Sequence, residues 1–192
     1  MDRWLGTIMY IAEKVPDGIP SRTHLQVIVY YALKALGMDT DEAGFVCGHQ
    51  GPHSRFIEDC CDALVDDGCL VEESDGRLRV SAVCVTPGIP PSDPLDASKA
   101  ESLIRYLSRL SSEELLLHVF TDDAVVENGM EPDTKTMGVV LDRRVEIARG
   151  MVIGGKASIM RGAELADMDP VVFMGLIDSA TNGASPREYG SD

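Results

Sequence analysis

Basic residues are scarce in this chain. Its 192 residues include 17 Lys and Arg against 32 Asp and Glu, a net charge of −15. The shortage holds in both halves, with 7 bases against 14 acids in residues 1–92 and 10 against 18 in residues 93–192. Affinity for nucleic acid comes mainly from Lys and Arg that neutralise phosphates. The acidic composition therefore disfavours non-specific binding to nucleic acid or to an anionic membrane, although adaptation to a salty cytoplasm would produce the same surplus.

Long apolar runs are also missing. No segment approaches the roughly 20 apolar residues that span a bilayer. Residues 1–15 contain acids and lack the continuous apolar core of a secretory signal. These absences predict a cytoplasmic protein with no membrane partner and with reduced thiols.

Catalytic motifs are absent as well. The chain has neither a phosphate-binding glycine loop nor a dinucleotide fingerprint. Cys47 is close to His49 and His53, so a small zinc site or an activated thiol is an alternative there. The spacing matches no common zinc finger, and the better interpretation is that most cysteines are small buried apolar residues. We therefore predict no enzymatic activity, no metal and no cofactor.

Hydrophobic periodicity is clear in the first half. Apolar residues at helical spacing predict helices over 2–15, 21–36 and 54–67. A short β-favouring run at 45–47 precedes the third of these helices. Residues 69–80 contain two alternating runs, and the Asp-Gly pair between them is a strong hairpin signal. This order of elements is the one expected of a winged helix, and it predicts a winged-helix domain over 1–84.

Local signals set the expected boundaries of these elements. Thr23 and Gln26 have the spacing of a capping box at the start of the second helix. Gly51-Pro52 is expected to turn the chain after the short strand, and Gly68 to end the third helix.

Prolines mark a linker at residues 85–95, and the remainder of the chain reads as helical. Ser98 with Glu101, and Ser111 with Glu114, have capping-box spacing. A helix is predicted over 134–150, and residues 151–177 read as helix, turn, helix. The predicted fold class is mostly α with a small β-hairpin wing: a winged helix-turn-helix domain, then an all-helical domain over 96–192 that ends in a helix-turn-helix-like unit.

Residues 1–81 resemble the YwgA-like family of prokaryotic winged-helix proteins, and more loosely the antitoxins that share its glycine-proline turn. The resemblance is carried by the apolar helix Leu25–Leu36, by Gly51-Pro52-His53-Ser54 opening a helix, and by Asp66-Asp67-Gly68-Cys69-Leu70-Val71 entering the wing. It implies a fold more than a function.

Residues 143–177 resemble a family of small prokaryotic antitoxin-like proteins. The shared pattern is Gly155-Lys156-Ala157-Ser158, an alanine-rich helix, a short turn and a last helix containing Phe173. Two positions depart from it. Asp167 replaces the usual turn glycine, and Asp tolerates a left-handed turn better than most residues. Gly162 replaces a helical alanine, which either weakens that helix or marks a close packing contact.

Contact with DNA is the main alternative for function. In the first domain the candidate nucleic-acid contacts are His53, Ser54 and Arg55 at the start of a helix and Arg77 and Arg79 in the wing. That helix then becomes acidic, and the two wing arginines have Glu72 and Glu73 across the hairpin as ordinary pairing partners. Phosphates would therefore meet repulsion along much of this face.

The last helix carries the other candidate surface. Residues 170–179 contain none of the Arg, Lys, Asn or Gln side chains that read base edges. The residues predicted to pack against a partner are its apolar members Val171, Val172, Phe173, Met174 and Ile177. The leading hypothesis is a non-enzymatic regulatory or adaptor protein that acts through protein–protein contacts, as a homodimer and with an unknown protein partner. The alternative is a transcription regulator or an antitoxin-type DNA-binding protein.

Overall fold

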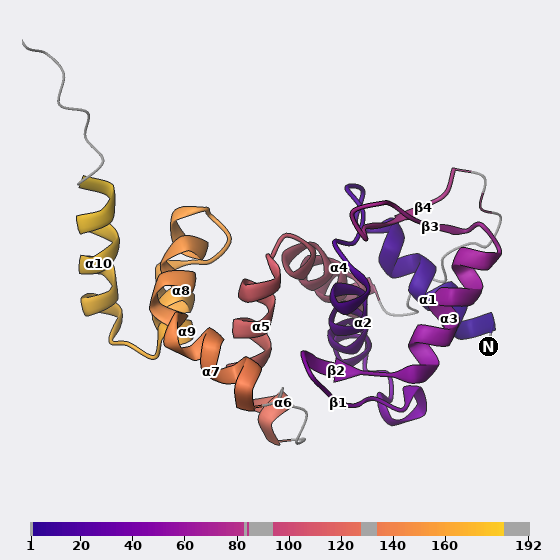
Figure 1. The fold of residues 1–192 in the computed structure, drawn as a ribbon, viewed down its shortest axis with the longest axis horizontal. Helices are drawn as coiled ribbons and strands as arrows, with labels where there is room; N and C mark the ends of the chain where they lie inside the picture. Colours follow the sequence, from indigo (N-terminus) through magenta and orange to yellow (C-terminus); the bar gives the residue numbers. More distant parts are fainter. Residues whose placement is uncertain (1, 83, 85–93, 128–133, 183–192) are drawn as a thin grey trace, which may run out of the picture. The chain divides into compact units, whose positions relative to one another are not determined.

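The structure, a computed structural model, describes residues 2–82, 84, 94–127 and 134–182 (Figure 1). These residues form ten α-helices and two small antiparallel β-hairpins, so the protein is mostly α-helical. The chain divides into two compact units, Met1–Met137 and Gly138–Asp192.

The core of the first unit is built around α2 (Arg22–Ala35), which is buried from His24 to Leu33. A helix that is apolar all round belongs inside a domain, and α2 packs against α1 (Asp2–Glu13), α3 (Arg55–Asp66) and α4 (Pro94–Ser108). Two further helices belong to this unit, α5 (Ser112–Phe120) and α6 (Asp123–Glu127).

Serine caps start three helices of the first unit. The hydroxyl of Ser21 accepts the backbone N–H of His24 at α2, and Ser54 accepts that of Ile57 at α3. Ser111 and Glu114 form the predicted capping box of α5. The other two predicted boxes are wrong. Ser21 caps α2 in place of Thr23, and Ser98 lies inside α4, which already begins at Pro94.

Two hairpins flank α3 in sequence. β1 (Val46–Gly48) pairs with β2 (Gly51–His53), and β3 (Leu70–Glu72) pairs with β4 (Leu78–Val80). The second hairpin is the one predicted from Asp-Gly. The first corrects an expectation, because Gly51-Pro52 belongs to a strand and the chain turns at 49–50 instead. Proline is tolerated there because a two-stranded ribbon consists only of edge strands.

Helices α8 (Arg144–Ile153), α9 (Ile159–Ala166) and α10 (Pro170–Asn182) pack together in the second unit. The turn between α9 and α10 contains Asp167 with φ 55°, the left-handed conformation that its residue type was expected to tolerate. The helix predicted over 134–150 is instead two helices, because α7 (Thr134–Asp142) ends before Arg143 and α8 begins after it.

The division into units differs from the predicted domain boundary. Residues 85–93 of the predicted linker lie outside the described residues. α4, which was grouped with the second domain, packs against α2 of the first unit through the buried residues Ala100, Ile104 and Leu107. Their spacing places them on one face of α4.

The thiols also differ from expectation in one respect. Cys69 and Cys84 form a disulfide, with their Cα atoms 4.5 Å apart, a normal separation for a bridge. Cys60 and Cys61 are buried free thiols, and Cys47 is exposed.

Candidate functional site

The predicted nucleic-acid contacts at the start of α3 are tied into the protein. Ser54 is fully buried: its hydroxyl donates to the carbonyl of Ala43, and its backbone N–H and carbonyl bond the side-chain amide of Gln26 at 3.0 and 3.1 Å. Arg55 is exposed, and its guanidinium meets Asp59 at 3.0 Å and Glu58 at 3.6 Å. Ser54 therefore has no surface to offer to a nucleic acid.

The two wing arginines are also engaged. Arg79 pairs with Glu73 at 2.9 Å, which is one of the pairings expected from the sequence. Arg77 pairs with Asp75 at 3.6 Å and donates a hydrogen bond to the carbonyl of Asp17. Exposed ion pairs of this kind contribute only about 0–1 kcal/mol, so phosphates can compete for these arginines at small cost.

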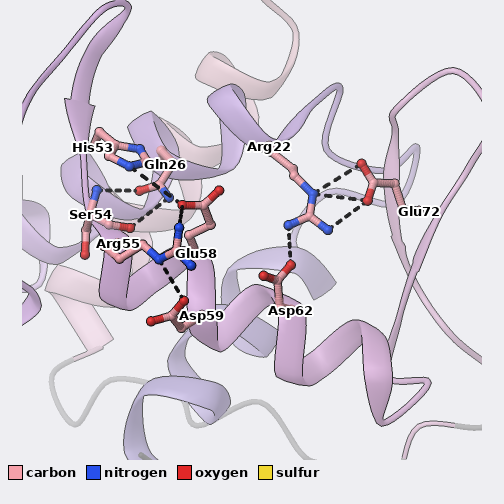
Figure 2. A network of polar contacts seen from close by, with 9 residues as sticks. All are labelled: Arg22, Gln26, His53, Ser54, Arg55, Glu58, Asp59, Asp62 and Glu72. Carbon is pink, nitrogen blue, oxygen red and sulfur yellow. Dashed lines mark hydrogen bonds and ion pairs between the residues drawn. The ribbon is translucent and has the colours of Figure 1, made fainter.

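Another arginine, Arg22, forms an ion-pair network between distant parts of the chain, which sequence reasoning missed (Figure 2). Arg22, at the first position of α2, contacts Asp62 of α3 at 2.6 Å and Glu72 of β3 at 2.8 Å. Hydrogen bonds to Glu72 and then to Asp62 raise the pKa of Arg22. The network joins three elements that are 40 and 50 residues apart in sequence. No local pattern could have indicated it.

Beside this network lies a cavity of about 330 Å³. Its walls come from the first two turns of α2, from the β1–β2 hairpin and from α3. Leu25, Pro52 and Cys61 are apolar or weakly polar lining residues, and Glu58 and His53 bring charged or polar groups. The volume falls at the lower end of the range for small-molecule sites, ~300–1,000 Å³.

Cysteine chemistry is disfavoured at this cavity. Burial raises the pKa of the Cys61 thiol to about 11, so the thiol is protonated near neutral pH and is a poor nucleophile. Cys47 is exposed on β1 and does not line the cavity. In the described part of the chain, no three His, Cys, Asp or Glu side chains gather as a metal site would require.

The predicted partner-packing residues separate into two sets. Phe173 and Ile177, four residues apart on α10, are buried in their own unit. Val171, Val172 and Met174 are 70%, 57% and 42% exposed. Phe173 lies against Gly162 of α9, where an added Cβ would be 2.7 Å from its ring. The prediction that Phe173 and Ile177 face a partner is thus replaced by a core role.

Among the described residues, no helix has the length and apolar character required to cross a membrane. Comparison of the chain with models of protein families, with curated proteins and with solved structures finds no match. The two resemblances therefore remain predictions.

Proposed function

We propose that this protein is a non-enzymatic regulator or adaptor that acts through protein–protein contacts, as a homodimer formed through the exposed face of α10. In this proposal the first unit is a winged-helix-like module and the second is a helix-turn-helix-like module. The observation that carries the proposal is the exposure of Val171, Val172 and Met174 on one short helix. Contiguous apolar surface of this kind marks interaction sites.

The distribution of exposed apolar side chains supports the choice of the second unit. Eleven large apolar residues are exposed in the described parts of the chain. Seven of them belong to this smaller unit: Val139, Ile153, Ile159, Met160, Val171, Val172 and Met174. Charged residues are depleted at the cores of protein interfaces and Met is enriched, which fits the composition of α10.

DNA binding is the second candidate function. In its favour are the left-handed turn at Asp167 between α9 and α10, which suits a helix-turn-helix, and the exposed Arg55 and Arg79. Against it are the net charge of −15 and the absence of basic residues along α10. In this alternative, Arg55, Arg77 and Arg79 would exchange their carboxylate partners for phosphates.

Added salt should change the affinity in opposite directions for the two functions. Two copies that each carry −15 repel one another, and added salt screens that repulsion. A dimer held by apolar contacts should therefore tighten between 50 and 500 mM NaCl. DNA binding should weaken steeply over the same range, because counterions compete for the phosphates. Sedimentation velocity and a duplex-binding assay, each run across the salt series, measure the two dependences.

A substitution tests the surface itself. Val171→Asp combined with Val172→Asp should convert the dimer to monomer while the helical circular dichroism is retained, because both side chains point to solvent in the single chain. Val46→Asp is the matched control, since Val46 and Val172 are equally exposed at 57% but lie in different units. A wild-type protein that is monomeric at every salt concentration would refute the proposal, as would loss of the dimer in the control.

A further inference from the structure

We propose that the cavity between α2, the β1–β2 hairpin and α3 binds a small organic cation, an apolar group that carries a primary ammonium. This site is independent of the proposed dimer surface, because all of its walls belong to the first unit. The charged groups around the cavity differ in how much hydrogen-bonding capacity they still have, and this difference favours a cation over an anion.

The positive group at the cavity is already neutralised. Arg22 makes short contacts to two carboxylates, at 2.6 Å to Asp62 and 2.8 Å to Glu72, and its Nε donates to Glu72 at 3.1 Å (Figure 2). An anionic ligand would have to displace one of these carboxylates or share the guanidinium with both. The Gln26 amide is likewise committed, because it bonds the backbone of Ser54 through both its oxygen and its nitrogen.

The negative group, in contrast, makes only longer contacts. Glu58 lines the cavity, and its carboxylate is 3.6 Å from Nη1 of Arg55 and 3.8 Å from Nε2 of His53. Both distances exceed the 2.7–3.2 Å of a hydrogen bond. Its acceptor oxygens can therefore take hydrogen bonds from an ammonium without breaking a short contact, and charge-assisted hydrogen bonds of this type are the strong ones. The overall charge of −15 also attracts a cation to the site.

The remaining walls suit a carbon skeleton. Leu25 and Pro52 contribute hydrocarbon, and the backbones of Gly48 and Gly51 line the cavity without a side chain. Cys61 presents a neutral thiol, because burial raises its pKa to about 11. A volume of about 330 Å³ fits a fragment-sized ligand with one ring and a short tail. α5 supports the hairpin wall, since a Cβ on Gly51 would be 2.8 Å from Val119.

The test uses 2-phenylethylammonium as the probe and 3-phenylpropanoate as its anionic counterpart, both titrated into the ¹⁵N-labelled full chain at constant ionic strength. We expect the ammonium to bind with a dissociation constant on the order of millimolar, which is typical of a ligand with about nine non-hydrogen atoms. Its amide shifts should concentrate at Gln26, Gly51, Glu58 and Cys61. The propanoate should bind at least tenfold more weakly.

Two matched variants test the role of the carboxylate. Glu58→Gln removes the acceptor charge at the cavity and should weaken the ammonium roughly tenfold. Asp66→Asn removes the same charge at the other end of α3, at an exposed side chain that does not line the cavity, and should leave the affinity within twofold. The proposal is overturned if 20 mM 2-phenylethylammonium causes no shifts at the cavity, if the propanoate binds as tightly, or if both variants weaken binding equally. None of these outcomes bears on the dimer.

Discussion

Replacement of Gly162 by alanine directly tests the packing of the second unit. Gly162 lies inside α9, where alanine would normally stabilise a helix by about 1 kcal/mol over glycine. Here the added Cβ would lie 2.4 Å from Cγ2 of Val152 and 2.7 Å from Cε1 of Phe173. Two carbon atoms are in favourable contact at about 3.5–4.0 Å, so both neighbours must move by roughly 1 Å.

The expected magnitude follows from setting these two effects against each other. Forcing extra volume into a packed core costs about 1–3 kcal/mol, and Phe173 is fully buried, so its ring has little room to retreat. Because two neighbours must move, one of them fully buried, the cost should lie in the upper part of that range, about 2–3 kcal/mol. After the gain of about 1 kcal/mol in helix propensity is subtracted, Gly162→Ala should lower the free energy of unfolding by about 1–2 kcal/mol. With a urea slope of ~2 kcal/mol per molar, the midpoint of the second unit should fall by roughly 0.5–1 M.

Two glycines provide matched controls within the same unit. Gly150 in α8 and Gly175 in α10 are exposed and have nothing within 4 Å of an added Cβ. Gly150→Ala and Gly175→Ala should each stabilise by about 0.5–1 kcal/mol. Urea titration followed by circular dichroism, with hydrogen exchange of the α8–α10 amides as the local readout, measures all three. If Gly162→Ala stabilises the unit as much as the controls do, the close contact between α9 and α10 is refuted.

Three further predictions concern the first unit and the helix caps. Desolvation by burial lowers the pKa of His24 below 6.5, so the unfolded chain binds more protons than the folded chain does at acidic pH. The free energy of unfolding should therefore fall as the pH drops below about 6.5, by at most ~1.4 kcal/mol per pH unit. Urea titrations of the wild type and His24→Gln between pH 7.5 and 5 check this, and equal slopes would exclude His24. The disulfide closes a loop with a sequence separation of 15 residues, for which chain entropy alone gives ~3 kcal/mol of stabilisation. Cys84→Ala should therefore lower the free energy of unfolding by about that amount, and a reductant, which destabilises the wild type, should have no further effect on this variant. Ser54→Ala removes a helix cap and leaves the buried carbonyl of Ala43 without its hydroxyl donor, so it should lower the free energy of unfolding by about 2 kcal/mol. Ser158→Ala removes a more exposed cap and should cost only ~1 kcal/mol. Equal losses of stability for the two variants in thermal unfolding would contradict the role of the buried Ser54 hydroxyl.

Local signals in the sequence predicted local structure well. The capping box of Ser111 and Glu114, the Asp-Gly hairpin turn and the left-handed Asp167 are all present. Each depends on atoms within about four residues, so the chain around it contains all the information needed. Gly162 belongs with them, because a glycine where a helix prefers alanine indicates close approach by a neighbouring element, although the sequence does not identify that neighbour as Phe173.

Signals that depend on distant partners could not be predicted. Thr23 and Gln26 have capping-box spacing, yet the Gln26 side chain bonds the backbone of Ser54, 28 residues away. Arg22 shows no special pattern, and its partner Glu72 is 50 residues away. The cavity arises from the same long-range arrangement, because its walls come from three elements of the first unit. Local propensity favours a cap or a turn at such positions, and tertiary packing decides otherwise.

The composition of α10 explains why its role was predicted only in part. An apolar run in sequence does not say which of its members face inward. In the folded unit Phe173 and Ile177 share the buried face, as residues four apart on a helix do. Val171, Val172 and Met174 then project outward, although burial of each would gain about 1.5–3 kcal/mol. A polar outer face would have satisfied the single chain equally well, and so the retained hydrophobicity is the reason to expect that another surface covers it.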